Sequence, residues 1–206
     1  MTVILVNGSP HEKGCTYTAL EEIAGALEQN GIEAEIFWLG TDPLAGCIGC
    51  GVCAKTGSCF RKDRVNEFAK LAENADGFIF GTPVHYAGAS GAITSFMDRA
   101  FYSAGQYLRG KPAACVASCR RAGAIAPFDQ LNKYFSISCM PIVSSQYWNM
   151  VHGSTPADVR QDLEGLQTMR TLGNNMAWLL KCIALGREHG VVFEEKEPRM
   201  RTDFIR

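Results

Sequence analysis

Short apolar runs alternate along the chain with longer stretches in which apolar residues recur every three or four positions. The runs at residues 2–7, 76–81, 113–118 and 140–145 have the composition of buried strands. Residues 32–39 alternate apolar and charged side chains, as a strand nearer the edge of a sheet does. The longer stretches predict amphipathic helices over residues 16–30, 64–73, 93–101, 128–135 and 156–185. Five strand–helix alternations predict an α/β fold, with a doubly wound, five-stranded parallel sheet and helices on both faces.

Three loops follow predicted strands, at residues 8–18, 82–91 and 118–124. Ligands of open parallel sheets bind outside the carboxyl ends of the strands, so we expect these loops to form one site. The first loop leads into a helix start, where free backbone N–H groups, the helix dipole and nearby hydroxyls attract an anion. It lacks the residue order of a Walker A loop and of G-x-G-x-x-G, which favours a monophosphate. The alternative is an ordinary turn whose serine and threonine only cap the helix.

The second loop combines a stiff turn with planar side chains and small residues. Pro83 restricts the backbone, His85 and Tyr86 offer flat hydrogen-bonding surfaces, and the small residues that follow let a flat ligand approach the main chain. A lid loop whose aromatic side chains pack on a neighbour is the alternative. In the third loop, Arg120 and Arg121 could bind a second anionic molecule such as a nicotinamide dinucleotide phosphate, or they could be solvated.

Four cysteines lie within thirteen residues in the pattern C-x2-C-x2-C-x5-C, as Cys47, Cys50, Cys53 and Cys59. The x2 spacing lets neighbouring sulfurs reach one metal centre, and the interspersed glycines give the backbone the freedom to turn. A [4Fe–4S] cluster fits this run better than zinc, which with four cysteines usually shows two separated C-x2-C pairs. A mononuclear metal and free or disulfide-forming thiols are the alternatives.

Other chemically notable residues have simple structural interpretations. Asp98 and Arg99 are expected to form a local charged pair on the helix after the second loop. Cys115 to Arg121 matches the C-x5-R string of cysteine phosphatases, but the cysteine lies inside a predicted strand and not at its exit. Cys15 lies at a helix N-terminus, a position that would lower the pKa of its thiol, and helix-capping geometry explains this position as well. The cysteines in apolar elements are predicted to be buried small hydrophobes, namely Cys115, Cys139 and Cys182.

Composition and charge narrow the class of protein. Hydrophobic residues make up 47% of the chain and charged residues 20%, as in ordinary globular proteins. The net charge of −1 argues against nucleic-acid or membrane-surface binding. Neither a membrane-spanning run nor a signal peptide is recognisable, so we expect a cytoplasmic protein whose nine cysteines are thiols, ligands or redox groups.

Several strings resemble those of the flavodoxin-like NADPH-dependent FMN reductases. They are Asn7-Gly8-Ser9-Pro10, Gly14-Cys15-Thr16, Gly81-Thr82-Pro83-Val84-His85-Tyr86 and Ser95-Phe96-Met97-Asp98-Arg99. The resemblance covers roughly residues 1–150. The cysteine motif is similar to the compact motif of the iron–sulfur flavoproteins, a branch of the same family. In other relatives a similar segment binds no cluster and forms a tight loop near the flavin.

The resemblance implies non-covalently bound FMN and assigns residues to its parts. The phosphate would be held by Ser9, His11, Cys15, Thr16, Tyr17 and Thr18. The isoalloxazine would lie along Pro83, Val84, His85, Tyr86, Ala87 and Gly88, with Ser118, Arg120 and Gly123 at its other edge. His85 and Tyr86 are the candidate catalytic residues, as proton donors to a substrate anion.

The implied function is an FMN-dependent oxidoreductase. Electrons would pass from NAD(P)H or a ferredoxin-like donor to a quinone, an azo or nitro compound, or another small acceptor. One alternative is an electron-transfer protein with FMN and a [4Fe–4S] cluster and no small substrate; another is a thiol or metal redox sensor on this scaffold. The expected partners are a small-molecule acceptor or a redox protein, and further copies of the chain in a homodimer or homotetramer. We expect one domain over residues 1–185, with a cysteine-rich insertion at 40–60, followed by a charged tail at 186–206 that is loose or docks on a neighbouring subunit.

Overall fold

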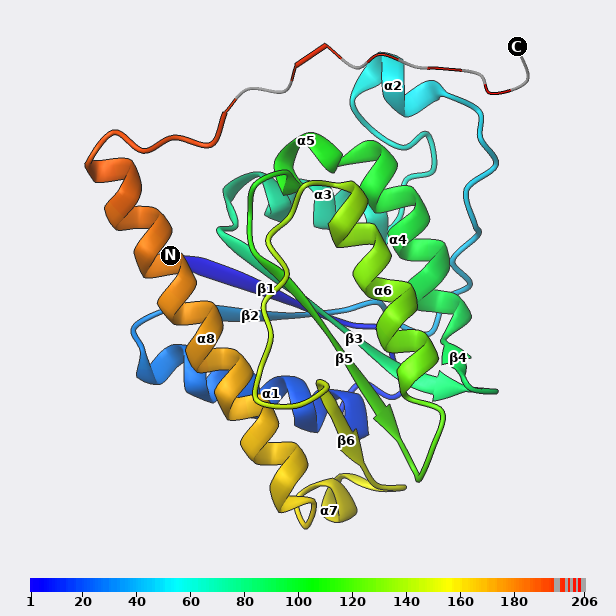
Figure 1. Cartoon of the computed structure of the whole chain (residues 1–206). Helices are drawn as coiled ribbons and strands as arrows, with labels where there is room; N and C mark the ends of the chain where they lie inside the picture. The colour runs from blue at the N-terminus through cyan, green and yellow to red at the C-terminus, as the bar shows by residue number, and fades with distance from the viewer. Residues whose placement is uncertain (195–196, 199, 201, 203, 205–206) are drawn as a thin grey trace.

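Five parallel strands form the central sheet of the computed structural model, which describes residues 1–194, 197, 198, 200, 202 and 204. The strands are β1 (Thr2–Asn7), β2 (Glu33–Trp38), β3 (Gly77–His85), β5 (Ala113–Cys119) and β6 (Met150–His152), and they lie in the order β2-β1-β3-β5-β6 (Figure 1). A two-residue strand, β4 (Gly88–Ala89), pairs antiparallel with the end of β3. Counted without that hairpin strand, the order is 2-1-3-4-5, so the predicted flavodoxin-like sheet is confirmed.

Helices cover both faces of the sheet. One face carries α1 (Cys15–Gln29) and α8 (Leu163–Glu188), and the other carries α3 (Arg64–Asn74), α4 (Gly91–Ser103), α5 (Gly105–Leu108) and α6 (Ile125–Ile137) (Figure 1). Alternation along β1 supplies both cores: Val3 and Leu5 point to α1 and α8, while Ile4 and Val6 point to the other layer. The second core is aromatic, and Phe68 lies at its centre with ring centroids 5.2 to 6.1 Å from Phe37, Phe78, Phe80 and Phe96.

The last strand and the last helix differ from the sequence prediction. Residues 140–145 do not form a strand; Ile142 makes only an isolated bridge with Ala113, because Pro141 has no N–H to donate to a ladder. The fifth parallel strand is β6 instead. The helix expected over 156–185 is interrupted after α7 (Pro156–Val159), and α8 starts anew where the Asp162 carboxylate accepts a hydrogen bond from Gly165 N.

The second predicted loop is more ordered than the sequence suggested. Strand β3 continues past its expected end to His85, and residues 88–91 of the predicted loop begin with β4. Tyr86 and Ala87 form the two-residue turn between these strands, with φ values of 50° and 58°. A tight turn of this kind needs left-handed backbone at both positions, which glycine or asparagine normally supplies. The hairpin therefore stores backbone strain at the mouth of the predicted site.

The start of the predicted C-terminal tail packs on the same chain. Arg109 Nη1 donates to the carbonyl of Glu194 at 3.0 Å, and its guanidinium lies 4.6 Å from the centre of the Phe193 ring. The expected tail, residues 186–206, begins inside α8, and residues 195, 196, 199, 201, 203, 205 and 206 lie outside the described part. Among the described helices, none has the length and apolar character needed to cross a bilayer.

Ala87→Gly is expected to stabilise the protein. Glycine adopts a positive φ without the Cβ clash, so the free energy of unfolding should rise by about 1 kcal/mol. Urea unfolding with an unchanged m-value measures this change. Ala89→Gly is the matched control: Ala89 lies in β4 outside the strained turn, and its replacement should destabilise by about 0.5 kcal/mol. Equal destabilisation by both changes would contradict the assignment of strain to the turn.

Candidate functional site

The loop between β1 and α1 is fixed by side chains that bond its backbone. Asn7 is fully buried; its Nδ2 donates to Glu12 O at 2.9 Å and its Oδ1 accepts from Ser9 N at 3.1 Å. Trp38 Nε1 donates to Ser9 O at 2.8 Å from the next strand. Gly14 is required where the loop closes, since a Cβ there would lie 2.9 Å from the His11 Cβ. The loop thus has one defined shape before any ligand binds.

The N-terminus of α1 is open to an anion. Its first residue follows Gly14, no side chain in the described part of the chain caps it, and its first turn carries no acidic residue. In contrast, α3, α4 and α8 begin with the side-chain caps Asp63, Ser90 and Asp162. Uncapped N–H groups at a helix start, with the positive end of the helix dipole, fit a phosphate group.

The predicted hydroxyls around this turn have different partners. The Thr16 and Ser118 hydroxyl oxygens are 2.8 Å apart, which joins the first loop to the end of β5. The Thr18 hydroxyl donates back to Gly14 O at 3.1 Å, so its proton is already engaged within the helix. Ser9 Oγ accepts from His11 N at 3.1 Å and keeps its own proton for another acceptor. His11 is exposed at the loop tip, and Tyr17 is partly buried on the first turn.

The lowered pKa expected for the Cys15 thiol is not found, and its place in the phosphate site stays a prediction. Burial raises the pKa of the Cys15 thiol, and the backbone hydrogen bond at the helix start offsets only part of that effect. The partly buried thiol lies 3.6 Å from the carbonyl oxygen of Gly153, next to α7. Its position at the helix N-terminus therefore does not make it a reactive thiolate.

The three predicted loops meet at the carboxyl edge of the sheet. Gly8 N donates to Gly81 O at 2.9 Å, and the Ser90 hydroxyl donates to Gly8 O at 2.9 Å. The third loop contacts the second at Gly123, where a Cβ would lie 3.1 Å from the Cα and Cβ atoms of Ala87. The edge therefore places the uncapped start of α1 beside a strained hairpin and a glycine-containing loop.

Several candidate residues lie on the rim of this edge. His85, Tyr86, Ala87, Arg120 and Arg121 are exposed, and the Tyr86 side chain is fully so. Pro83, Val84, Gly88 and Gly123 are partly buried and form the floor between the second and third loops. The exposed side chains can reach a bound molecule from its solvent side, and their roles in binding stay predictions.

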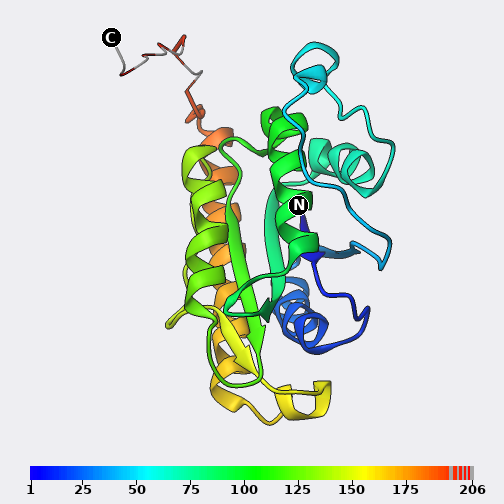
Figure 2. The same cartoon turned by 90° about the vertical axis from the view of Figure 1, so that its right-hand side faces the viewer.

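The cysteine-rich segment forms a separate feature outside the sheet. It contains a short helix, α2 (Val52–Thr56), which lies at the periphery of the molecule and contacts α4 (Figure 2). A cavity of about 30 Å³ is lined by all four cysteines of the motif, together with residues that include Phe60, Arg61, Arg99 and Tyr102. Left-handed glycines at positions 49, 51 and 57 turn the backbone around it.

This pocket has the donor chemistry of a metal site without its coordination geometry. The four cysteines are free thiols. Nowhere in the described ranges do three or more His, Cys, Asp or Glu side chains stand close enough to hold a metal ion. Four thiols around one cavity fit a thiolate-ligated metal, and the segment has to close around one.

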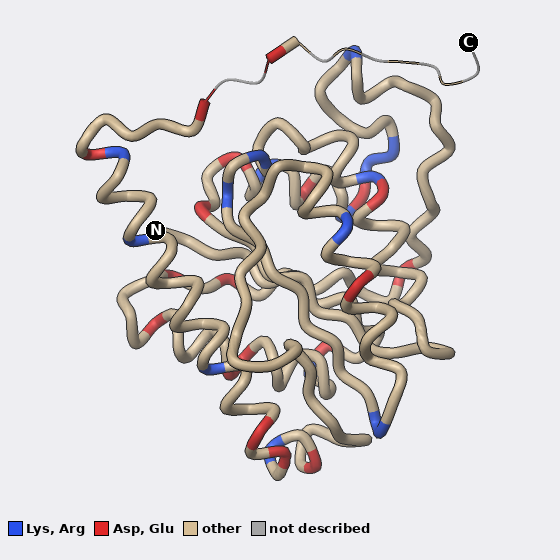
Figure 3. Tube along the Cα trace, in the orientation of Figure 1, with Lys and Arg blue, Asp and Glu red and all other residues tan. Residues whose placement is uncertain are grey.

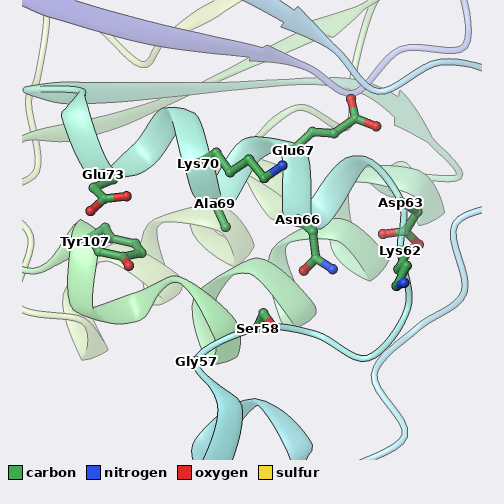
Figure 4. Close-up of a pocket in the computed structure, with 10 residues that line it drawn as sticks. All are labelled: Gly57, Ser58, Lys62, Asp63, Asn66, Glu67, Ala69, Lys70, Glu73 and Tyr107. Atoms are coloured by element: carbon green, nitrogen blue, oxygen red, sulfur yellow. The ribbon is translucent and has the colours of Figure 1, made fainter.

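Cys59 is the most firmly held of the four cysteines. Asn66 on α3 clamps its backbone: Oδ1 accepts from Cys59 N at 3.1 Å, and Nδ2 donates to Cys59 O at 2.8 Å. Its sulfur accepts from Arg99 Nη2 at 3.2 Å and Nε at 3.4 Å. Figure 4 shows Asn66 directed toward the segment at Ser58, across an open hollow of about 510 Å³ that contains no cysteine.

The local pairing expected for Arg99 was wrong. Its guanidinium pairs with Asp63, the cap of α3, at 2.7 and 2.9 Å, while Asp98 accepts a hydrogen bond from the Tyr134 hydroxyl. Burial and the bond to Asp98 raise the pKa of Tyr134. Burial lowers the pKa of Arg99, but its bonds to Asp63 and Cys59 outweigh this, so the pKa lies above the ordinary value. Arg99 stays charged although its side chain is only 2% exposed.

Positive charge surrounds the cysteines. Residues 43–62 contain Lys55, Arg61 and Lys62 and no acidic residue, as the blue segments near α2 in Figure 3 illustrate. A cationic environment stabilises an anionic, thiolate-ligated centre more than neutral thiols.

The remaining cysteines divide into buried and exposed. Cys115 is buried in β5, where burial raises the pKa of its thiol, so the phosphatase string has no reactive cysteine. The prediction of burial was wrong for Cys139 and Cys182, which are both exposed. Cys139 lies in a turn, with φ 55°. Cys182 lies on α8 but is not among the buried residues of that helix, although its neighbours in the sequence are apolar.

Sequence reasoning missed Arg99 and Asp63 as parts of the cysteine pocket. The available signal was helical periodicity: Arg99 lies between Phe96 and Ser103 on the buried stripe of α4. A charged residue on an apolar stripe must have a buried partner. The identity of that partner depends on how α3 and the cysteine segment fold back, which the local pattern does not contain.

Comparison with known proteins agrees with the geometry. A family model described as NADPH-dependent FMN reductase matches residues 1–155. An iron–sulfur flavoprotein of Methanocaldococcus jannaschii is 35% identical over 191 residues, which cover 89% of this chain and 99% of that protein. Among solved structures, RosB with bound 8-demethyl-8-formylriboflavin-5′-phosphate has a TM-score of 0.70 at 12% identity and covers 98% of this chain and 91% of its own.

An archaeal flavodoxin has the same fold, with a TM-score of 0.60 at 16% identity, covering 88% of this chain and 99% of its own. The resemblance inferred from the glycine, proline and cysteine strings is confirmed. The family match spans about three quarters of the sequence, and the archaeal relative spans most of it. The chain therefore belongs to the NADPH-dependent FMN reductase family.

Proposed function

We propose that this protein is an oxidoreductase with FMN at the carboxyl edge of the sheet and a [4Fe–4S] cluster in the cysteine segment. The observation that carries the proposal is the uncapped N-terminus of α1, held open at the junction of the three loops. The fold, the family and the archaeal relative's name as an iron–sulfur flavoprotein support it.

The phosphate of FMN would occupy the turn between Ser9 and Thr18. The first-turn N–H groups of α1 would donate to it, and Ser9 would add a hydroxyl. Thr16 and Ser118 would fix the distance between this turn and β5. The flat ring would lie against residues 83–88 and 118–123, where glycine and alanine leave the main chain accessible. When bound, FMN supplies the electron-transfer chemistry, and the protein supplies orientation and electrostatics.

His85 and Tyr86 would serve the substrate side. Both are exposed beside the predicted ring site, so the imidazole nitrogens and the phenol hydroxyl can reach a molecule lying on the flavin. The strained turn holds Tyr86 at the tip of the hairpin. Arg120 and Arg121 are cations suited to the phosphates of NAD(P)H on the opposite side.

The cysteines would hold the cluster through the sulfurs of Cys47, Cys50, Cys53 and Cys59. A quinone, an azo or nitro compound, or a redox protein would accept the electrons, and the working form would be a homodimer or homotetramer. NADPH oxidation by the pure protein with a small quinone would favour the enzyme over a pure electron carrier.

His11→Glu tests the phosphate site. A carboxylate at this exposed loop position would repel the FMN phosphate by roughly 1 kcal/mol, so the Kd for FMN should rise about fivefold. The Kd for riboflavin, which lacks the phosphate, should not change. Flavin fluorescence quenching measures both constants. Gln29→Glu adds the same charge at the other end of α1, about 20 Å away, and should leave both unchanged. Equal weakening of FMN and riboflavin by His11→Glu would contradict the site.

Cys50→Ser tests the metal site. Loss of one thiolate should reduce iron and acid-labile sulfide in anaerobically prepared protein to a small fraction of the wild-type content, with FMN retained. Cys139→Ser, an exposed cysteine outside the motif, should keep the full iron content. Wild-type iron content in Cys50→Ser would exclude Cys50 as a ligand. If the wild-type protein contained zinc and no acid-labile sulfide, the cysteines would form a mononuclear metal site and not a cluster site.

His85→Ala combined with Tyr86→Ala tests the proposed proton donors. The double variant should bind FMN as the wild type does, because neither side chain supports a buried element. Turnover with a quinone or nitro acceptor should fall at least about tenfold, since general acid assistance is lost. Steady-state kcat at saturating NADPH measures this, and an unchanged kcat would remove both residues from the mechanism.

A further inference from the structure

We propose that Arg99, held in place by Asp63, positions Cys59 as a metal ligand and makes the metal centre easier to reduce. The proposal rests on the metal centre proposed above. It concerns a residue that lies outside the cysteine motif, on the helix that follows the second loop. Arg99 would act through Cys59 as a positioning residue.

All five N–H groups of the Arg99 guanidinium have acceptors. Two go to the Asp63 carboxylate, at 2.7 and 2.9 Å, and one goes to Ala45 O at 3.3 Å. The remaining two, from Nη2 and Nε, go to the Cys59 sulfur at 3.2 and 3.4 Å. The side chain is 2% exposed, so water cannot substitute for any of them.

Two N–H groups of one buried guanidinium directed at one sulfur suit a sulfur that would carry negative charge as a metal ligand. A neutral thiol is a weak acceptor, whereas a sulfur that carries negative charge forms stronger, charge-assisted bonds. Arg99 and Asp63 already neutralise each other, so the pair adds an oriented N–H dipole at the sulfur and no net charge to the protein interior. This arrangement suits a thiolate that ligates a metal better than a free thiol.

Arg99 also fixes the two ends of the cysteine segment. Ala45 precedes the first cysteine of the motif, and Cys59 is the last. Hydrogen bonds from the Arg99 guanidinium to Ala45 O and to the Cys59 sulfur hold both ends of the segment against α4. Asp63 and Asn66 connect Arg99 and Cys59 to α3. The loop between these ends is free to close around a metal while its last ligand stays in place.

Hydrogen bonds to ligand sulfurs and nearby positive charge determine how easily an iron–sulfur centre accepts an electron. The reduced centre carries one more negative charge, which the Arg99 N–H groups stabilise more than the oxidised centre. Removing them should shift the reduction potential of the centre to more negative values and leave the FMN potential unchanged.

The test compares Arg99→Gln and Arg99→Lys with Lys70→Gln, a matched control that removes one exposed positive charge from α3 without contacting Cys59. Iron, sulfide and FMN are determined on anaerobic holoprotein, followed by a redox titration monitored at flavin and cluster absorption bands. At the wild-type midpoint, Arg99→Gln should lower the reduced-to-oxidised ratio of the metal centre about tenfold, equal to a shift of about 59 mV for one electron. Arg99→Lys should shift less, and Lys70→Gln should not shift.

Arg99→Gln leaves the Asp63 carboxylate without its partner. The second variant therefore combines Arg99→Gln with Asp63→Asn, in which the asparagine amide oxygen can still cap α3. Loss of iron from either variant supports the positioning role, provided that the variant retains FMN and that Lys70→Gln keeps its full iron content. In that case the reduction potential is measured on Arg99→Lys. A fully loaded variant with the wild-type midpoint would overturn the proposal. Wild-type protein without iron would instead refute the metal centre itself.

Discussion

The buried pair of Arg99 and Asp63 is the interaction on which the arrangement of the two proposed centres depends. Helix α4 starts at the carboxyl edge of the sheet, where the Ser90 hydroxyl donates to Gly8 O, and two turns later its Arg99 reaches the cysteine pocket. Breaking the pair would leave a charge buried without a partner, which costs about 3–5 kcal/mol in comparable proteins. The same helix therefore positions one loop of each centre.

The carboxyl edge of the sheet imposes the second constraint. Parallel strands end together there, so loops far apart in the sequence must share a small volume, and glycine is needed where they touch. Gly8 shows this, because a Cβ would lie 2.8 to 2.9 Å from Ile93 and Gly81 O. The strain in the turn at Tyr86 and Ala87 fits the same pattern, since strained backbone persists where the surrounding structure holds it for a functional purpose.

Patterns with a short period were predictable from the sequence. The continuous apolar run of β1 and the helical stripe of α1 placed both elements to within a residue, and glycine and proline strings located the three loops. Features that depend on distant partners were not predictable. The last strand lies at 150–152 because Ala117 N bonds Asn149 O, and Arg99 pairs with Asp63 thirty-six positions away. Exposure of Cys139 and Cys182 likewise depends on tertiary packing.

One chain is proposed to carry both FMN and a thiolate-ligated cluster. The most direct measurement is an anaerobic visible spectrum of the purified protein, with FMN, iron and acid-labile sulfide determined on the same sample. We expect flavin bands over a broad cluster absorption, with about one FMN, four irons and four sulfides per chain. Flavin bands without iron or sulfide, after reconstitution under reducing conditions, would contradict this proposal.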